Sequence, residues 1–253
     1  MTPAEETLFR RTLERGAAAV GVPLTDDHQD QCVRYTELLL RTNEHTNLTR
    51  IIEPGEVAVK HFVDSLTVFC AIGDLKLGAS VADVGTGAGF PGIVLKIIRP
   101  DLRLTLLDSL AKRLTFLREV TFALEMEDML FVHARAEEAG RDPDHRDRYD
   151  LVTARAVASL PTLLEWCTPL CAVRGRFVAM KAAGADEELS TSESAAGELG
   201  VHLESDIALS LPAVSDAALS EPSASRRLLV YRKNFPTRAR YPRRTPEIKA
   251  QPL

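Results

Sequence analysis

The stretch from Val81 to Gly92 constrains this chain more than any other. It reads Val-Ala-Asp-Val-Gly-Thr-Gly-Ala-Gly-Phe-Pro-Gly, with glycine at alternate positions 85, 87 and 89. Glycines adopt positive φ and let a ligand approach the backbone, and proline suits the first turn of a helix. The apolar run 93–98 continues as a helical face. The stretch predicts a buried strand, a tight turn and a helix whose free N–H groups face a ligand.

From Val81 onward the pattern alternates between short apolar runs and longer amphipathic segments, which predicts strands and helices in turn. The predicted strands are 81–84, 103–107, 129–132, 150–153, 175–180, 201–211 and 226–232, and the predicted helices are 91–99, 110–124, 160–172 and 184–199. This alternation predicts an α/β fold with a mainly parallel sheet and helices on both faces. Ligands of such sheets bind at the carboxyl ends of the strands.

Three further helices are predicted before the first strand, at about 3–20, 27–43 and 56–72. We therefore divide the chain into an N-terminal helical extension (1–75), a sheet domain (76–235) and a basic C-terminal tail (236–253). The tail has prolines at 236, 242, 246 and 252, and we expect it to be irregular or disordered. A Ser/Pro/Ala-rich loop is expected between the last two strands.

Charge is distributed unevenly along the 253 residues. The net charge is −5, yet residues 226–253 carry nine Lys/Arg and one Glu, a net of +8. A basic end is either a solvated tail or an arm for nucleic acid, and charge alone favours the solvated tail. No apolar run is long enough to span a membrane and no signal peptide is evident, so we expect a cytoplasmic protein. Four scattered cysteines indicate reduced, buried thiols rather than a metal site.

The glycine turn fits some ligands better than others. No Gly-Lys-Ser/Thr follows it, which argues against a P-loop, and its spacing is not the GxGxxG of a dinucleotide site. Asp108 ends the second predicted strand, 23 residues after Gly85. Its carboxylate could accept both ribose hydroxyls of NAD or of S-adenosylmethionine, or it could cap the next helix. The glycine spacing favours S-adenosylmethionine, which has no pyrophosphate.

Several motifs together resemble one known family, the RsmG (GidB) small-subunit ribosomal RNA methyltransferases. The motifs are Asn47-Leu-Thr49, His61-Phe-Val-Asp-Ser-Leu66, Asp83 to Gly92, Asp108-Ser-Leu-Ala-Lys-Arg113, Thr153-Ala-Arg-Ala156 and Tyr241-Pro-Arg-Arg-Thr-Pro246. The resemblance implies a Rossmann-like S-adenosylmethionine-dependent methyltransferase fold with an N-terminal helical extension. It also implies methyl transfer to N7 of a guanine in 16S rRNA, position 527 in the usual rRNA numbering.

The resemblance further implies which residues bind the cofactor. They are Gly85, Phe90, Ala136, Glu137 and Arg155, and we add Gly87 of the glycine turn and Asp108 of the second strand to the predicted cofactor site. Arg155 also stands out by itself, because an arginine just past a buried strand needs an anion, either a ligand or a nearby carboxylate such as Asp83. Phe90 could equally belong to the core, and Glu137 could be an exposed helix residue.

Guanine N7 attacks without losing a proton, so this reaction needs no general base. Alignment of the reactants and an acceptor near the purine would carry catalysis. No catalytic residue is assigned, and the candidates at the rim of the site are Asn47, His61, Asp64, Ser65 and Lys181. A lone histidine in an amphipathic helix is more often structural, so we weight His61 that way.

The expected partner is 16S rRNA within the small ribosomal subunit, bound by a monomer without a metal ion. Given the resemblance, we assign RNA binding to the basic tail, where cationic side chains neutralise phosphates and an aromatic ring stacks on a base. The assigned residues are Arg238, Arg240, Tyr241, Arg243 and Arg244, with Lys249 nearby. Three other hypotheses remain open: a methyltransferase of another substrate, an NAD-binding oxidoreductase, and a non-catalytic ribosome-assembly factor.

Overall fold

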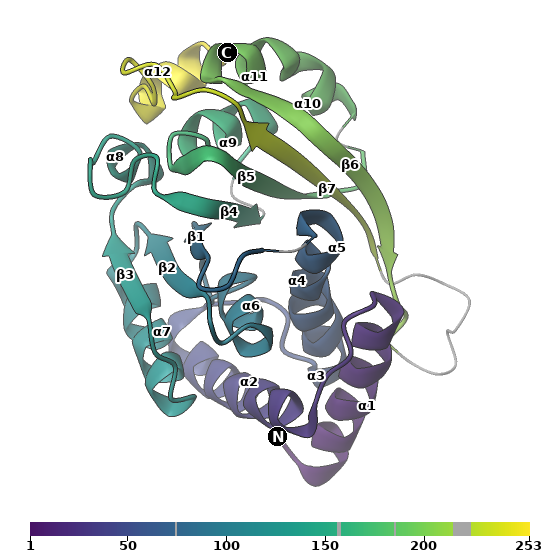
Figure 1. The fold of residues 1–253 in the computed structure, drawn as a ribbon. Helices are drawn as coiled ribbons and strands as arrows, with labels where there is room; N and C mark the ends of the chain where they lie inside the picture. The colour runs from purple at the N-terminus through teal and green to yellow at the C-terminus, as the bar shows by residue number, and fades with distance from the viewer. Residues whose placement is uncertain (74, 156–157, 185, 215–223) are drawn as a thin grey trace.

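A twisted sheet runs through the middle of the molecule (Figure 1). The computed structural model describes residues 1–73, 75–155, 158–184, 186–214 and 224–253. Within these residues the sheet has seven strands in the order β3-β2-β1-β4-β5-β7-β6. The strands are β1 (Ser80–Val84), β2 (Arg103–Asp108), β3 (Met129–His133), β4 (Tyr149–Arg155), β5 (Cys171–Ala182), β6 (Val201–Leu211) and β7 (Ala224–Lys233). Neighbours from β3 to β5 pair in parallel, and β7 runs antiparallel to both β5 and β6. The predicted mainly parallel α/β fold is confirmed.

The helices alternate with these strands after an all-helical start. The first group is α1 (Pro3–Ala19), α2 (Asp26–Thr46), α3 (Pro54–Val57), the π-helical turn η1 (Ala58–Val63), α4 (Asp64–Leu66) and α5 (Val68–Ile72). The second group is α6 (Gly92–Ile98), α7 (Ala111–Ala123), α8 (Ala136–Ala139), α9 (Leu160–Cys167), α10 (Asp186–Thr191), α11 (Glu193–Leu199) and α12 (Thr245–Ala250). None of the helices in the described part of the chain is both long and apolar enough to cross a membrane.

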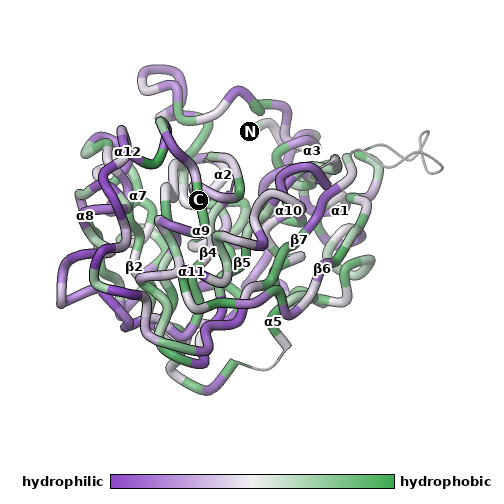
Figure 2. The backbone as a smooth tube through the Cα atoms, turned by 90° about the horizontal axis from the view of Figure 1, so that it is seen from above, coloured by the Kyte–Doolittle hydropathy of each residue, from purple (hydrophilic) through white to green (hydrophobic). Residues whose placement is uncertain are grey.

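Alternate side chains of each strand enter two separate cores, because successive residues of a strand point to opposite faces. In β4, Leu151 joins a core with α1 to α7, whereas Val152 joins a core with α9 and α11. Strands buried on both faces are apolar at successive positions, as Val81 and Ala82 are in β1. Hydrophilic stretches, such as that around α12, lie mostly at the periphery in Figure 2.

The N-terminal helices pack directly against the sheet. Phe9 of α1 and Tyr35 of α2 contact Phe62 edge to face, with ring centroids 5.4 and 5.5 Å apart. All three side chains are fully buried in the core that includes Val81 of β1. The extension predicted for residues 1–75 therefore supplies one cover of the sheet and shares its core.

Three predicted helices differ from the structure. The helix expected over 56–72 is divided among short helices and the π-helical turn η1. The helix expected over 160–172 ends at Cys167, and Cys171 already begins β5. The helix expected over 184–199 is two helices that meet at Ser192, with residue 185 outside the described residues. The Ser/Pro/Ala loop expected between the last strands falls largely on 215–223, also outside them.

The cysteine prediction is right for three of the four thiols. All four are free, and Cys32, Cys167 and Cys171 are buried, whereas Cys70 is exposed. No group of three or more His, Cys, Asp or Glu suited to a metal ion occurs among the residues that the structure describes.

The C-terminal tail is ordered, so the expectation of an irregular or disordered end is wrong. Residues 245–250 form α12, where Ile248 is fully buried, and Tyr241 is only 3% exposed. One charge of the tail meets a buried partner. Arg243 makes a bidentate ion pair with Glu165 of α9, whose side chain has no exposed surface. Figure 1 shows α12 in yellow beside the teal and green helices α8, α9 and α11.

Candidate functional site: a pocket at the carboxyl edge of the sheet

A cavity of about 890 Å³ lies where the parallel strands end. Its wall is formed by the ends of β1, β2, β4 and β5, by the loop after β3, and by the start of β7. Predicted cofactor residues Gly85, Gly87, Phe90, Asp108, Ala136, Glu137 and Arg155 all line it. The position matches the edge where open parallel sheets bind ligands.

Asp83 anchors the glycine loop from below. Its fully buried carboxylate accepts hydrogen bonds from the Thr86 hydroxyl at 2.6 Å, the Gly92 amide at 3.1 Å and the Thr153 hydroxyl at 3.0 Å. Burial raises the pKa of Asp83, and these three hydrogen bonds act against that increase. The carboxylate thus ties β1, both ends of the loop and β4 together, and it faces away from the cavity, which it does not line.

Gly89 shows why this loop needs glycine. Its φ is +97°, and a Cβ there would lie 2.5 Å from the Tyr35 hydroxyl and 2.7 Å from Leu117 Cδ2. The Tyr35 hydroxyl donates to the Ala88 carbonyl. The N-terminal helix α2 therefore supports the underside of the loop. No side chain larger than hydrogen fits between them without moving one of the two.

Asp108 is the central acceptor on the β2 side of the pocket. Its carboxylate, 1% exposed, accepts from the amides of Gly87 and Leu110, both at 2.9 Å. Arg113, one turn along α7, lies 3.1 Å from the same carboxylate. Asp108 therefore shapes the loop and the start of α7 while its carboxylate lies at the cavity wall. Of the two roles considered from the sequence, the structure shows that Asp108 holds the start of α7 through the Leu110 amide, and the role toward a ribose stays a prediction.

The β4 side of the pocket holds a cluster of opposite charges. Asp64, 2% exposed, accepts from Arg155 Nη1 at 2.9 Å and from Arg226 Nε at 2.8 Å. Arg155 also donates to the Lys60 carbonyl at 3.0 Å, and its guanidinium lies 5.3 Å from the centre of the Phe90 ring. The anion that Arg155 requires is thus Asp64 from the N-terminal helices, and the sequence-based suggestion of Asp83 is not what the structure shows.

His61 lies between these charges and Phe90. Its ring stacks on Phe90 with centroids 4.6 Å apart, and its Nε2 lies 2.9 Å from the Thr49 hydroxyl. Nδ1 faces Arg155 Nη2 at 3.4 Å, and since a guanidinium only donates, Nδ1 must accept. The proton is therefore on Nε2. Burial first, and then the charge of Arg155, lower the pKa of His61 to about 3.

The other rim candidates divide into two groups. Asp64, His61 and Lys181 line the cavity, and Lys181 pairs with Glu188 at 2.7 Å. Asn47 instead ends α2 as an exposed, left-handed C-cap, and it does not line the cavity. Ser65 is fully buried and donates to the His61 carbonyl in the preceding turn η1. These two side chains have structural positions.

The tail residues assigned to RNA binding also differ among themselves. Tyr241 is buried in the core with α9, so its ring is not open to a base. Arg243 is held by Glu165. Arg238 and Arg240 are exposed and share Glu198 as an ion-pair partner, and Arg244 is exposed. Only the exposed arginines of this group retain a surface that RNA could reach.

Several residues that line the pocket were not predicted from the sequence, and Arg113, Trp166 and Arg226 are among them. Arg113 follows Asp108 in a motif that was noted but not interpreted. Arg226 reaches the site because β7 runs antiparallel to β5, which places Arg226 opposite Ala182 at the carboxyl end of β5. Trp166 carries no sequence signal. Its indole nitrogen is buried and, among the described residues, is a side-chain polar atom without a hydrogen-bond partner.

Strand order and site position together define a class of protein. The order β3-β2-β1-β4-β5-β7-β6 with an antiparallel β7, and a pocket beside a glycine loop after β1, are those of the Rossmann-like methyltransferase fold. Solved structures agree on the fold. A methyltransferase from Thermoplasma acidophilum matches with a TM-score of 0.51 and 12% identity, covering 67% of this chain and 75% of that one. A SAM-dependent O-methyltransferase from Thermotoga maritima matches with a TM-score of 0.50 and 14% identity, covering 78% and 71%.

Sequence comparison identifies the family. The model of the family described as rRNA small subunit methyltransferase G matches residues 28–210. A curated protein named ribosomal RNA small subunit methyltransferase G from Ligilactobacillus salivarius is 45% identical over 246 residues, 96% of each chain. One of the same name from Acetivibrio thermocellus is 43% identical over 249 residues, 98% of each chain. The chain belongs to the rRNA small subunit methyltransferase G family, as the resemblance predicted.

Proposed function

We propose that this protein transfers a methyl group from S-adenosylmethionine to N7 of a guanine in 16S rRNA. The observation that carries the proposal is membership of the family over nearly the whole chain. The position of the pocket, at the carboxyl edge beside the glycine loop, supports it. The NAD-binding oxidoreductase considered from the sequence is not favoured by either observation.

The residues on the β1 and β2 side fit S-adenosylmethionine. Asp108 offers a buried carboxylate at the end of β2, which is suited to a ribose diol. The loop presents glycines rather than side chains, and a Cβ on Gly87 would meet nothing nearer than 3.8 Å, so the space above the loop is open to a ligand. Trp166 lines the same cavity. Together, Asp108 and the loop supply an acceptor and an approach to the backbone.

The charge of the pocket as a whole fits an anionic nucleic acid. The described lining includes six basic side chains, Lys60, Arg113, Arg135, Arg155, Lys181 and Arg226, and four acidic ones, Asp64, Asp108, Glu137 and Glu188. The pocket is thus net positive in a chain whose net charge is −5. A local positive field attracts phosphates even when the whole protein is acidic.

Methylation of N7 requires no proton transfer in the methyl-transfer step. S-adenosylmethionine, when bound, would supply an electrophilic methyl group on a sulfonium for the neutral lone pair of N7, with S-adenosylhomocysteine as the leaving group. N7 carries no proton to remove, so no general base is required. His61 is neutral at neutral pH, and its only ring proton lies on the nitrogen that faces Thr49. The protein contributes by aligning the two reactants and by excluding water.

Charge develops on the guanine as it is methylated, and the pocket carboxylates can offset it. Asp64 is the nearest candidate to the β4 side, but it already bonds two arginines. Its charge is therefore largely used to hold Arg155 and Arg226 in place. We assign Asp64 the role of positioning these arginines, and we leave the acceptor for the purine unassigned.

One experiment tests the proposal directly. N7-methylguanosine is mapped in 16S rRNA from cells with and without the gene, and from gene-deleted cells supplied with the Asp108→Ala variant. Loss of the modification at one guanine, restored by the wild-type chain only, is the expected result. Full methylation of that guanine in deleted cells would contradict the rRNA substrate. Tight NAD binding without S-adenosylhomocysteine binding would contradict the whole proposal.

A second comparison addresses the partner and its place in the cell. We expect the reaction to occur in the cytoplasm, where rRNA is assembled into subunits, and to be carried out by a monomer. Unmethylated small subunits and protein-free 16S rRNA are offered to the purified protein with labelled S-adenosylmethionine. Faster labelling of the subunit is the expected result, and faster labelling of free rRNA would place the reaction before assembly.

A further inference from the structure

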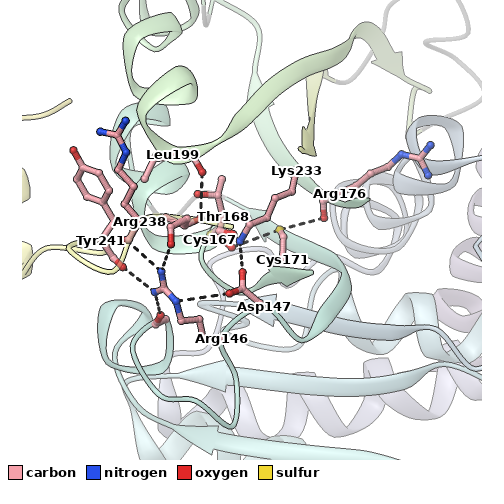
Figure 3. Close-up of polar contacts among 12 residues, drawn as sticks. Arg146, Asp147, Cys167, Thr168, Cys171, Arg176, Leu199, Lys233, Arg238 and Tyr241 are labelled. Carbon is pink, nitrogen blue, oxygen red and sulfur yellow. Dashed lines mark hydrogen bonds and ion pairs between the residues drawn. The ribbon is translucent and has the colours of Figure 1, made fainter. Parts of the chain in front are cut away.

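The C-terminal segment, residues 236–253, is fastened to the loops beside the pocket. Figure 3 shows Arg146 at the centre of this attachment, with its guanidinium aimed at backbone oxygens of two separate segments. It donates to the Gly140 carbonyl at 2.7 Å and, in the C-terminal segment, to the carbonyls of Tyr241 at 2.8 Å and Thr237 at 2.6 Å. A guanidinium has five donors in a fixed fork, so one side chain fixes the end of α8 relative to this segment.

Side-chain contacts continue this attachment to the pocket wall. Thr245 donates its hydroxyl to Glu137 Oε1 at 2.5 Å, and Glu137 is 7% exposed where it lines the cavity. Pro242 packs so closely on the end of α8 that a Cβ on Gly140 would lie 3.0 Å from Pro242 Cγ. The short helix α8 is thus held by the C-terminal segment at Glu137 and at the Gly140 that ends it.

A third contact reaches the pocket through α9. Arg243 holds Glu165 by its backbone amide and by both ends of its guanidinium fork, at 2.7, 2.9 and 2.7 Å. Trp166, the next residue, lines the cavity. The same segment therefore supports two separate pieces of the wall, Glu137 and Trp166.

The first of these pieces, Glu137, lies on the side of the pocket where Asp108 is. Asp108 pairs in register with His133 of β3, and the chain after β3 leads within four residues to Glu137. Four residues is one helical turn or a short loop, so Glu137 and Asp108 belong to one wall. The arginine cluster of Arg155 and Arg226 lies toward β4 and β5 instead.

We propose that the C-terminal segment positions the Glu137–Trp166 wall for S-adenosylmethionine, with Thr245 as the positioning residue. The inference rests on the proposed function and goes beyond it, since it gives the segment a role at the cofactor in place of the role as an RNA arm alone. Thr245 acts through Glu137: without its hydroxyl, a nearly buried carboxylate loses a donor and turns from its place.

The test uses the full chain with three variants at α12. Thr245→Val removes the hydroxyl at nearly constant volume, Thr245→Ser restores it, and Glu247→Gln is a control that changes an exposed residue of the same helix. Affinity for S-adenosylhomocysteine is measured by calorimetry, and KM for S-adenosylmethionine, KM for rRNA and kcat are measured separately. We expect Thr245→Val to weaken cofactor affinity about tenfold, a change of about 1.4 kcal/mol. KM for rRNA should stay unchanged, and Thr245→Ser should recover the affinity.

Each outcome bears on the inference. Wild-type affinity for S-adenosylhomocysteine in Thr245→Val would overturn it, as would an equal loss in Glu247→Gln. Addition of Glu137→Gln decides whether the two side chains act as a unit, because the double variant should then bind as the single variants do. A wild-type chain that binds no S-adenosylhomocysteine would contradict the proposed function itself, which separates the two failures.

Discussion

At the scale of single residues, the Asp108 carboxylate at the end of β2 has one observed role and one proposed role. It holds the Gly87 and Leu110 amides, and it is the buried acceptor on the proposed ribose side of the pocket. Replacement by asparagine changes one carboxylate oxygen to an NH₂ group, which would face the N–H donors of Gly87 or Leu110. The lost hydrogen bonds to a charged group are worth about 1.5–3 kcal/mol each, so cofactor affinity should fall at least about tenfold.

Calorimetric titration of Asp108→Asn with S-adenosylhomocysteine measures this loss. Asp144→Asn, an exposed aspartate in the loop before β4, is the matched control and should bind like the wild type. Unchanged affinity in Asp108→Asn would mean that this carboxylate serves the loop alone.

His61 makes the free energy of unfolding depend on pH. Its pKa is lowered to about 3 in the folded chain, against about 6.5 when unfolded. Between these two pKa values His61 is protonated in the unfolded chain and neutral in the folded chain. The free energy of unfolding is therefore highest above pH 6.5 and falls as the pH drops below that value. The change from pH 7 to pH 5 should cost about 2 kcal/mol. Urea denaturation of the wild type and of His61→Gln at both pH values checks this, and an equal pH dependence in both chains would contradict it.

At the scale of elements, the junction between β1 and α6 depends on one missing side chain. A Cβ on Gly92 would lie 2.9 Å from Asp83 Oδ2 and 2.9 Å from Leu106 Cδ2. Gly92→Ala should therefore destabilise the fold by about 2 kcal/mol, because the buried neighbours have no room to move. Gly197→Ala is the control: nothing lies within 4 Å of its Cβ position in α11, and alanine there should stabilise by about 0.5–1 kcal/mol. Urea denaturation measures both, and equal effects would mean that the close approach is unimportant.

Local patterns predicted β1, β2 and β4 well, because buried parallel strands are continuous apolar runs bounded by glycine, proline or charge. The end of α9 was missed, because the apolar run from Leu170 to Val173 is compatible with a buried helix and with a buried strand. The π-helical turn around His61 was missed for a similar reason: helical periodicity over 56–72 contains no signal for one wider turn.

The candidate site was predictable where one segment supplies it and not where segments meet. Asp108 and the glycine loop could each be predicted from the residues next to them in the sequence. The pairing of Asp64 with Arg155 and Arg226 joins residues 91 and 162 positions apart, and only the folded sheet brings them together. Nothing in the spacing of Glu165 and Arg243 indicates a buried ion pair either, and this pair orders the tail that composition alone predicts to be irregular.

At the scale of the whole molecule, charge counted along the sequence overstates the basic tail. Arg243 is neutralised by Glu165, and Arg238 and Arg240 share Glu198. The positive surface that remains combines exposed tail arginines with the net positive pocket. An RNA bound at the pocket would meet positive charge from β7 and from the loop after β3, in a protein whose net charge is −5.

This distribution predicts how RNA binding depends on salt. Each phosphate contact contributes about 0.7 to the slope of log affinity against log salt for single-stranded RNA. Arg240→Ala with Arg244→Ala should lower the slope by up to about 1.4 and leave S-adenosylhomocysteine affinity unchanged. Arg34→Ala, an exposed arginine on α2, is the control for loss of charge alone and should leave the slope nearly as it was. Filter binding of a 16S rRNA fragment across a salt series measures all three chains. A slope that both sets of variants leave intact would assign the tail to the cofactor wall alone, because ion pairs that serve only the fold release no counterions when RNA binds.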